Sequence, residues 1–145
     1  IDDTGLADGM SYSLSYSKAN LYLALASDKD VDSQDLVRMV MQYQMDNLKL
    51  GAMYQQNEDN LGTKDESGYF VSAAYKIDKT TLKAQYGFIE DDVDGDEEET
   101  LSLGADYKLS KNTKAYIFYT DNTDSEVDSS DDEDSSFGVG MEHKF

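Results

Sequence analysis

Apolar and polar residues alternate with a period of two along most of this chain. In residues 10–17, Met10, Tyr12, Leu14 and Tyr16 alternate with four serines. Because successive side chains of a β-strand point to opposite faces, this pattern predicts a strand with one apolar and one polar face. The same alternation recurs at residues 37–45, 48–55, 69–77, 82–88, 101–109 and 137–145.

Two further segments are expected to be strands, although their patterns are less clear. Residues 20–26 are fairly apolar on both faces. In residues 113–120, the apolar face is either Ala115, Ile117 and Tyr119, or Tyr116 and Phe118, and the pattern does not decide between them. The chain is therefore expected to contain nine strands.

The segments between the predicted strands are of two kinds that alternate along the chain. Short polar segments at 18–20, 46–47, 78–80 and 110–112 have the composition of hairpin turns. Long acidic segments, expected to be loops, lie near residues 1–8, 27–35, 57–67, 90–99 and 121–136. Tight turns at one rim and long loops at the other are typical of an antiparallel up-and-down transmembrane β-barrel, so residues 1–145 are expected to form a single all-β barrel segment.

The distribution of charge supports this division. The formal net charge is −19, and 27 of the 31 acidic residues lie in the five acidic segments, which contain only two of the 12 basic residues. The predicted loops are thus strongly acidic, whereas the strands are mildly basic. An acidic surface disfavours a nucleic-acid partner, which requires clustered Lys and Arg. No apolar run is long enough for a membrane-spanning helix.

Aromatic residues on the apolar face lie near both ends of the predicted strands. This is the placement of the aromatic girdles that flank the apolar band of a membrane barrel. A soluble β-sandwich remains an alternative, because alternation alone does not distinguish lipid from a protein core. The predicted girdle residues are Tyr16, Tyr43, Tyr54, Tyr75, Tyr86, Phe88, Tyr107 and Phe145.

The opposite face of the same strands is polar, with several charged residues. Such side chains are costly towards lipid but suit a water-filled pore. The predicted pore-lining residues are Arg38, Gln42, Gln44, Lys49, Gln55, Lys76, Lys83, Gln85, Asp106, Lys108 and Glu142.

No catalytic residue, cofactor or metal site is expected. The chain has one histidine, His143, on an apolar face, no cysteine and no Gly-x-Ser-x-Gly motif. The acidic stretch 90–99 does not fit an EF-hand, because Leu101 occupies the position of the bidentate acid. Weak divalent binding by the acidic loops is a hypothesis that rests on charge density alone.

The last segment, Phe137–Phe145, resembles the closing strand of general Gram-negative outer-membrane porins, which end in Gly-x-x-x-His-x-Phe. The stretch 107–113 is similar to the last periplasmic turn of that family, and it also resembles residues 75–81 of this chain. The resemblance implies a 16-stranded, usually homotrimeric barrel in the bacterial outer membrane, in contact with lipid and lipopolysaccharide. It also implies that Phe145 is the signal recognised by the barrel-assembly machinery.

If Phe145 is periplasmic, nine strands place residue 1 outside the cell, so the chain is expected to be the C-terminal part of a larger barrel. The expected function is passive diffusion of ions and small hydrophilic solutes. We expect cation preference, because the acidic rim outweighs the basic wall. The alternative is a plugged barrel whose acidic loops act as an adhesin or phage receptor.

Overall fold

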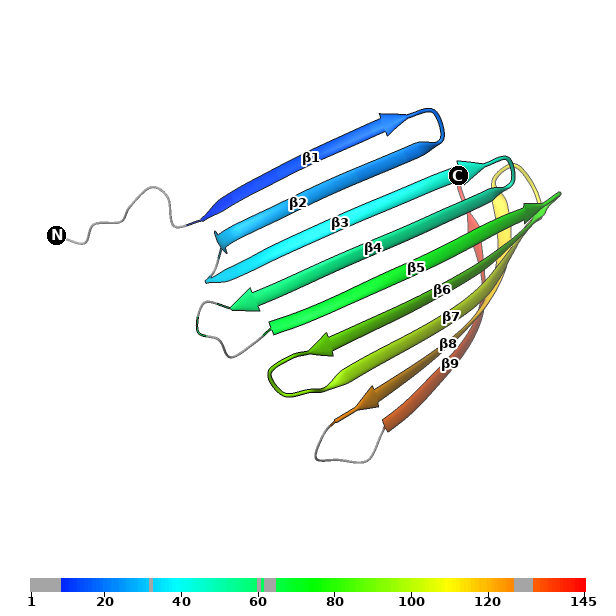
Figure 1. Cartoon of the computed structure of the whole chain (residues 1–145). Coiled ribbons are helices and arrows are strands. Elements are labelled where there is room, and N and C mark those ends of the chain that lie inside the picture. The colour runs from blue at the N-terminus through cyan, green and yellow to red at the C-terminus, as the bar shows by residue number, and fades with distance from the viewer. Residues whose placement is uncertain (1–8, 32, 60, 62–64, 127–131) are drawn as a thin grey trace.

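The protein forms one antiparallel β-sheet of nine strands (Figure 1). The computed structural model describes residues 9–31, 33–59, 61, 65–126 and 132–145. The strands are β1 (Met10–Lys18), β2 (Leu21–Val31), β3 (Gln34–Met45), β4 (Leu48–Asp59), β5 (Asp65–Ile77), β6 (Thr80–Asp91), β7 (Glu97–Lys108), β8 (Thr113–Ser125) and β9 (Asp132–His143). The predicted all-β meander is confirmed.

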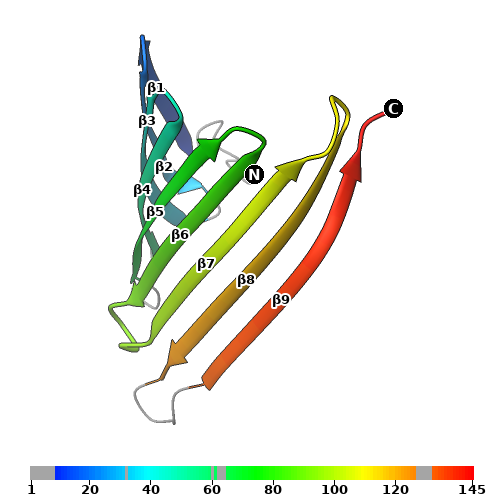
Figure 2. The same ribbon diagram turned by 90° about the vertical axis from the view of Figure 1, so that its right-hand side faces the viewer.

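Each strand pairs only with its neighbours in sequence, from β1 at one edge to β9 at the other. Figure 2 shows that the sheet curves strongly, so that it has a concave and a convex face. The turns of two to four residues lie at one end of the strands, and the connections at the other end include three of five or six residues (Figure 1). We call these ends the short-turn rim and the long-connection rim.

The register places the apolar positions of all nine strands on one face. Directly paired residues of antiparallel strands point to the same side. Leu103 pairs with Ala84 on β6 and with Tyr119 on β8, and Tyr119 pairs in turn with Phe137. A shift of one residue in any strand would expose its polar set on this face, so the alternation in the sequence fixes the register.

The apolar face is not covered by other parts of the chain. Among the described residues, no hydrophobic side chain is buried, and Leu14, Leu103 and Val139 are 73%, 47% and 70% exposed. A second sheet, which a soluble sandwich would need, is absent from the described part of the chain. A continuous apolar surface of this extent requires an apolar environment. The described residues include no helix long and apolar enough to cross a membrane.

The strands extend further into the acidic segments than the sequence pattern indicates. The connections at the long-connection rim are shorter than the acidic segments predicted to be loops. Of the 21 described acidic residues in segments 27–35, 57–67, 90–99 and 121–136, 17 lie in strands. Backbone pairing continues beyond the point where one face must be apolar, so the alternation ends before the strand does. Residues 1–8, 32, 60, 62–64 and 127–131, also assigned to acidic loops, lie outside the described residues.

The predicted turns are present at the short-turn rim. At this rim, the first three hairpins each have a two-residue turn, at 19–20, 46–47 and 78–79. A four-residue turn at 109–112 joins β7 to β8. The first residue of each two-residue turn has a positive φ: 50° at Ala19, 45° at Asp46 and 50° at Asp78. The Cβ of any such residue approaches the neighbouring carbonyl, but aspartate tolerates this conformation better than alanine because its short polar side chain can hydrogen-bond locally.

Ala19 is therefore a position where the backbone is strained by its side chain. We expect Ala19→Asn to stabilise the protein by about 0.5–1 kcal/mol, since asparagine enters the left-handed region more readily. The reciprocal change, Asp46→Ala, should destabilise it by a similar amount. Urea unfolding in phospholipid vesicles, with the protein at its full natural length, measures both; equal midpoints for Ala19→Asn and wild type would contradict this account.

Candidate functional site

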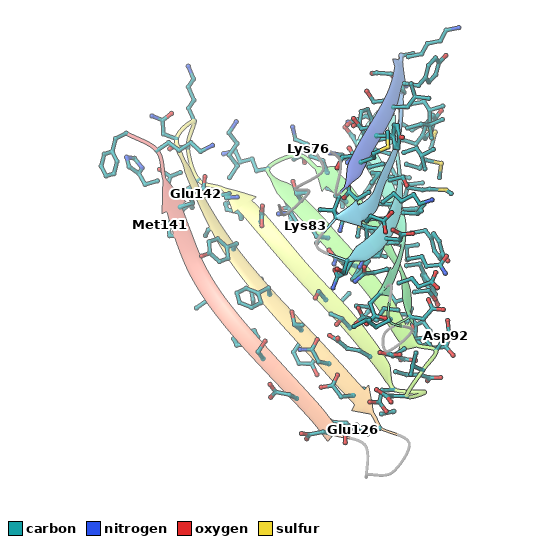
Figure 3. The ribbon with its side chains drawn as sticks, turned by 90° about the vertical axis from the view of Figure 1, so that its left-hand side faces the viewer. Lys76, Lys83, Asp92, Glu126, Met141 and Glu142 are labelled. Carbon is teal, nitrogen blue, oxygen red and sulfur yellow. The ribbon has the colours of Figure 1, made fainter. Side chains whose placement is uncertain are left out.

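The concave face of the sheet carries most of the polar side chains of the strand interiors. Lys76, Lys83 and Glu142 project from this face, and Met141, next to Glu142 on β9, lies on the other side (Figure 3). The register connects the predicted polar positions across the sheet, because Lys49 pairs with Ala74, which pairs with Lys83. All the residues predicted from the sequence to line a pore therefore share one face.

A ladder of ion pairs crosses the concave face from β6 to β9. The Lys83 Nζ lies 2.7 Å from Oδ2 of Asp106 on β7, and the same oxygen is 3.6 Å from Nζ of Lys114 on β8. Lys114 continues to Glu142 Oε2 at 3.1 Å, and Glu142 Oε1 lies 3.6 Å from Nζ of Lys144. Each of the two carboxylates is thus held between two ammonium groups.

Lys114 is the central member of this ladder and was not among the predicted site residues. Its strand is the one whose phase the sequence pattern left open. In the structure, Ala115, Ile117 and Tyr119 share the apolar face, which puts Lys114 on the concave face opposite Lys108 and Glu142. The signal that identifies it is pairing with the neighbouring strands, whose phases are clear.

Hydrogen bonds between directly paired side chains reinforce the rest of this face. Arg38 Nη2 donates to Gln55 Oε1 at 3.0 Å, between β3 and β4. The hydroxyls of Ser102 and Thr120 are 3.1 Å apart between β7 and β8. Between these two hydrogen-bonded pairs, the concave face has a hollow with a volume of about 400 Å³. Its lining includes Gln42, Lys49, Lys83, Gln85 and Ser102. The concave face can therefore hold water and small polar solutes.

Three of the aromatic rings on the concave face lie directly opposite a glycine. Phe70 pairs with Gly87, Phe118 with Gly138 and Tyr116 with Gly140. A Cβ at Gly140 would come within 2.5 Å of the Tyr116 ring, so the ring lies flat against the backbone only because the side chain is missing. These glycines keep large rings close to the wall and leave the space in front of them open.

The predicted girdle tyrosines lie on the convex face in two rows. Tyr16, Tyr43, Tyr75 and Tyr107 each lie one or two residues before the end of a strand that runs towards the short-turn rim. In a second row, near the middle of the strands, the Tyr69 ring centroid is 6.1 Å from that of Tyr86 and 5.7 Å from that of Phe88. Tyr54 pairs with Tyr69, and Tyr119 pairs with Phe137, so this second row extends from β4 to β9.

His143 and Phe145 lie at the short-turn end of the chain. The Nδ1 of His143 is 2.8 Å from the Thr113 hydroxyl on β8, and its ring contacts Phe145 edge to face at 4.9 Å. Both contacts secure the end of β9 to the sheet. Among the described residues, no group of three or more His, Cys, Asp or Glu side chains is arranged to hold a metal ion.

Comparison with solved structures places this arrangement among outer-membrane proteins. The fold matches OmpT, an outer membrane protein of Vibrio cholerae, with a TM-score of 0.82 and 21% identity over 93% of this chain and 49% of the other. It also matches an anion-selective porin from Comamonas acidovorans, with a TM-score of 0.79 and 17% identity over 94% of this chain and 49% of the other. The chain spans about half the length of these proteins. No curated protein matches the sequence.

A family model described as Gram-negative porin matches residues 2–127, which is most of the chain. This match agrees with the two-faced antiparallel sheet and with the fold of the solved outer-membrane proteins. The chain therefore belongs to the Gram-negative porin family of the bacterial outer membrane.

Proposed function

We propose that the protein is a passive diffusion channel for ions and small hydrophilic solutes. The observation that carries this proposal is the opposition of the two faces, one continuously apolar and exposed, the other polar and bridged by ion pairs. In a membrane the apolar face contacts lipid, and the concave face then encloses water. The predicted pore-lining residues form this wetted wall, together with Lys114.

The ends of the sheet support an orientation in the membrane. The rows of aromatic side chains on the convex face suit the two membrane–water interfaces. We place the short-turn rim in the periplasm and the acidic long-connection rim outside, next to lipopolysaccharide, as is usual for such barrels. Phe145 then lies on the periplasmic side, where it serves as the signal for the barrel-assembly machinery.

The two edge strands indicate that further strands complete the barrel. β1 and β9 are not paired with each other, and a membrane leaves no water to satisfy open backbone groups. The family suggests a 16-stranded barrel that assembles as a homotrimer. We propose this organisation for the protein at its full natural length.

Single-channel recording in a planar lipid bilayer tests the proposed function. The purified protein, at its full natural length, should produce stepwise increases in current that grow with salt concentration. A folded, membrane-inserted protein without conductance would instead support a plugged barrel that acts as an adhesin or phage receptor through its acidic rim.

The charges of the wall and rim predict a preference for cations. Acidic residues crowd the long-connection rim, for example Glu97, Glu98 and Glu99 on β7, and they concentrate cations at that mouth. In a tenfold gradient of potassium chloride, the reversal potential should have the sign of potassium permeation. Replacing these three glutamates by glutamine should move the potential towards zero; a clear chloride preference of the wild type would contradict the prediction.

The orientation of the two faces predicts how a new charge is tolerated. Leu103 lies mid-strand on the apolar face, and Leu103→Arg should destabilise the protein by about 1–4 kcal/mol, because arginine facing lipid is costly, most of all at the bilayer midplane. Gln85→Arg is the matched control, because Gln85 lies at a similar height on the concave face. Urea unfolding in vesicles measures both; equal losses of stability would show that the faces are assigned wrongly.

A further inference from the structure

The short-turn rim of the concave face gathers lysine side chains from β5, β7 and β8, from two turns and from the residue that follows β9. A groove of about 620 Å³ lies between them. Its basic lining residues are Lys76, Lys79, Lys108, Lys111, Lys114 and Lys144. We call this groove the lysine mouth.

The acidic residues of the lysine mouth are fewer, and two are already engaged. Asp78, Asp106 and Glu142 line the same groove. Asp106 is bridged by Lys83 and Lys114, and Glu142 by Lys114 and Lys144. The mouth therefore keeps a positive surplus, and the bridged lysines are held in place on the wall.

Lys76 and Lys108 are the lysines best placed to meet a solute. Both lie on the concave face, Lys76 opposite Thr81 and Lys108 opposite Lys114, and both are exposed. Within the described residues, no carboxylate lies within ion-pair distance of either side chain. Two ammonium groups that line one groove without counterions attract an oxyanion, and lysine is a common partner of phosphate.

The other end of the concave face has the opposite charge. In Figure 3, Asp92 and Glu126 lie at the end of the sheet remote from Lys76. A strand of 12 residues, such as β6, spans about 40 Å, several times the Debye length of about 10 Å at 0.1 M salt. The two mouths therefore act on mobile ions as separate regions of opposite potential.

We propose that the lysine mouth is a binding site for small oxyanions, such as inorganic phosphate, and that the opposite charges of the two mouths make the channel conduct unequally in the two directions. This inference rests on the proposed function, because it requires an open pore. It is compatible with cation preference, because an ion passes the two mouths one after the other. The acidic mouth favours cations, and the oxyanion site lies at the other end.

Single-channel recording at low salt, with the protein at its full natural length, tests the inference. At 0.1 M potassium chloride, the currents at equal and opposite voltages should differ by a factor of about 1.5, and the difference should nearly vanish at 1 M, where the Debye length is about 3 Å. Millimolar phosphate added on the side of the lysine mouth should lower the current, whereas phosphate on the other side should have little effect.

The orientation of each channel can be determined with one introduced cysteine, because residues 1–145 contain none and the parent channel serves as the control for the reagent. Val93, exposed in the connection between β6 and β7, can be replaced by cysteine at the acidic mouth. A charged thiol reagent that is too large to pass through the pore then changes the current only when it is added on that side. Every phosphate addition is thereby assigned to one mouth.

Matched variants identify the lysines involved. Lys76→Gln with Lys108→Gln should remove at least half of the current asymmetry and of the phosphate effect. Lys18→Gln is the control, because Lys18 lies at the same rim but on the apolar face, where it pairs with Leu21, and it should leave both unchanged. Conductance at 1 M salt shows whether each variant still forms an intact channel.

The outcomes separate this inference from the proposed function. A wild-type channel that conducts, but with equal currents in both directions and the same response to phosphate from either side, would overturn the inference alone. A phosphate effect that survives the double substitution in a conducting channel would also overturn it. Absence of any conductance would overturn the proposed function itself.

Discussion

Every strand of this protein has to satisfy two different solvents at once, and this requirement determines most of the structure. Side chains at odd and even positions leave opposite faces of the sheet, so a membrane strand cannot place both sets in the same environment. Because a shift of one residue exchanges the two sets, the pairing of each strand with its neighbours is strongly determined. The face of Leu103 and the face of Lys83 are thereby separated across the whole sheet.

This requirement also explains how much could be predicted from the sequence. Nine strands, their antiparallel order and the four turns at one rim follow from alternation and turn composition, and the structure confirms them. Two features did not follow. The strand ends were placed too early, because beyond the lipid both faces meet water and the alternation disappears. The face of Lys114 could not be assigned, because both sides of β8 carry aromatic residues, and only pairing with β7 and β9 resolves it.

The ion-pair ladder on the concave face matters more for electrostatics than for stability. The side chains of Lys83 and Asp106 are 48% and 20% exposed, and those of Lys114 and Glu142 are 37% and 44% exposed. Pairs as accessible as these contribute only about 0–1 kcal/mol each. Their effect is to hold charges of alternating sign at fixed positions on the concave face. They also neutralise Asp106 and Glu142, whose negative charge would otherwise weaken the positive potential of the lysine mouth.

The strand ends that carry the acidic residues separate two kinds of sequence change at the long-connection rim. Carboxylates such as those of Glu58, Glu90 and Asp134 belong to hydrogen-bonded strands, so their height and spacing are set by the backbone ladder of the sheet. The tips that join these strands can be exchanged, lengthened or shortened with little effect on that array. A change of sequence or length in the connections can therefore alter the outline of this rim while the acidic charges of the strand ends keep their positions.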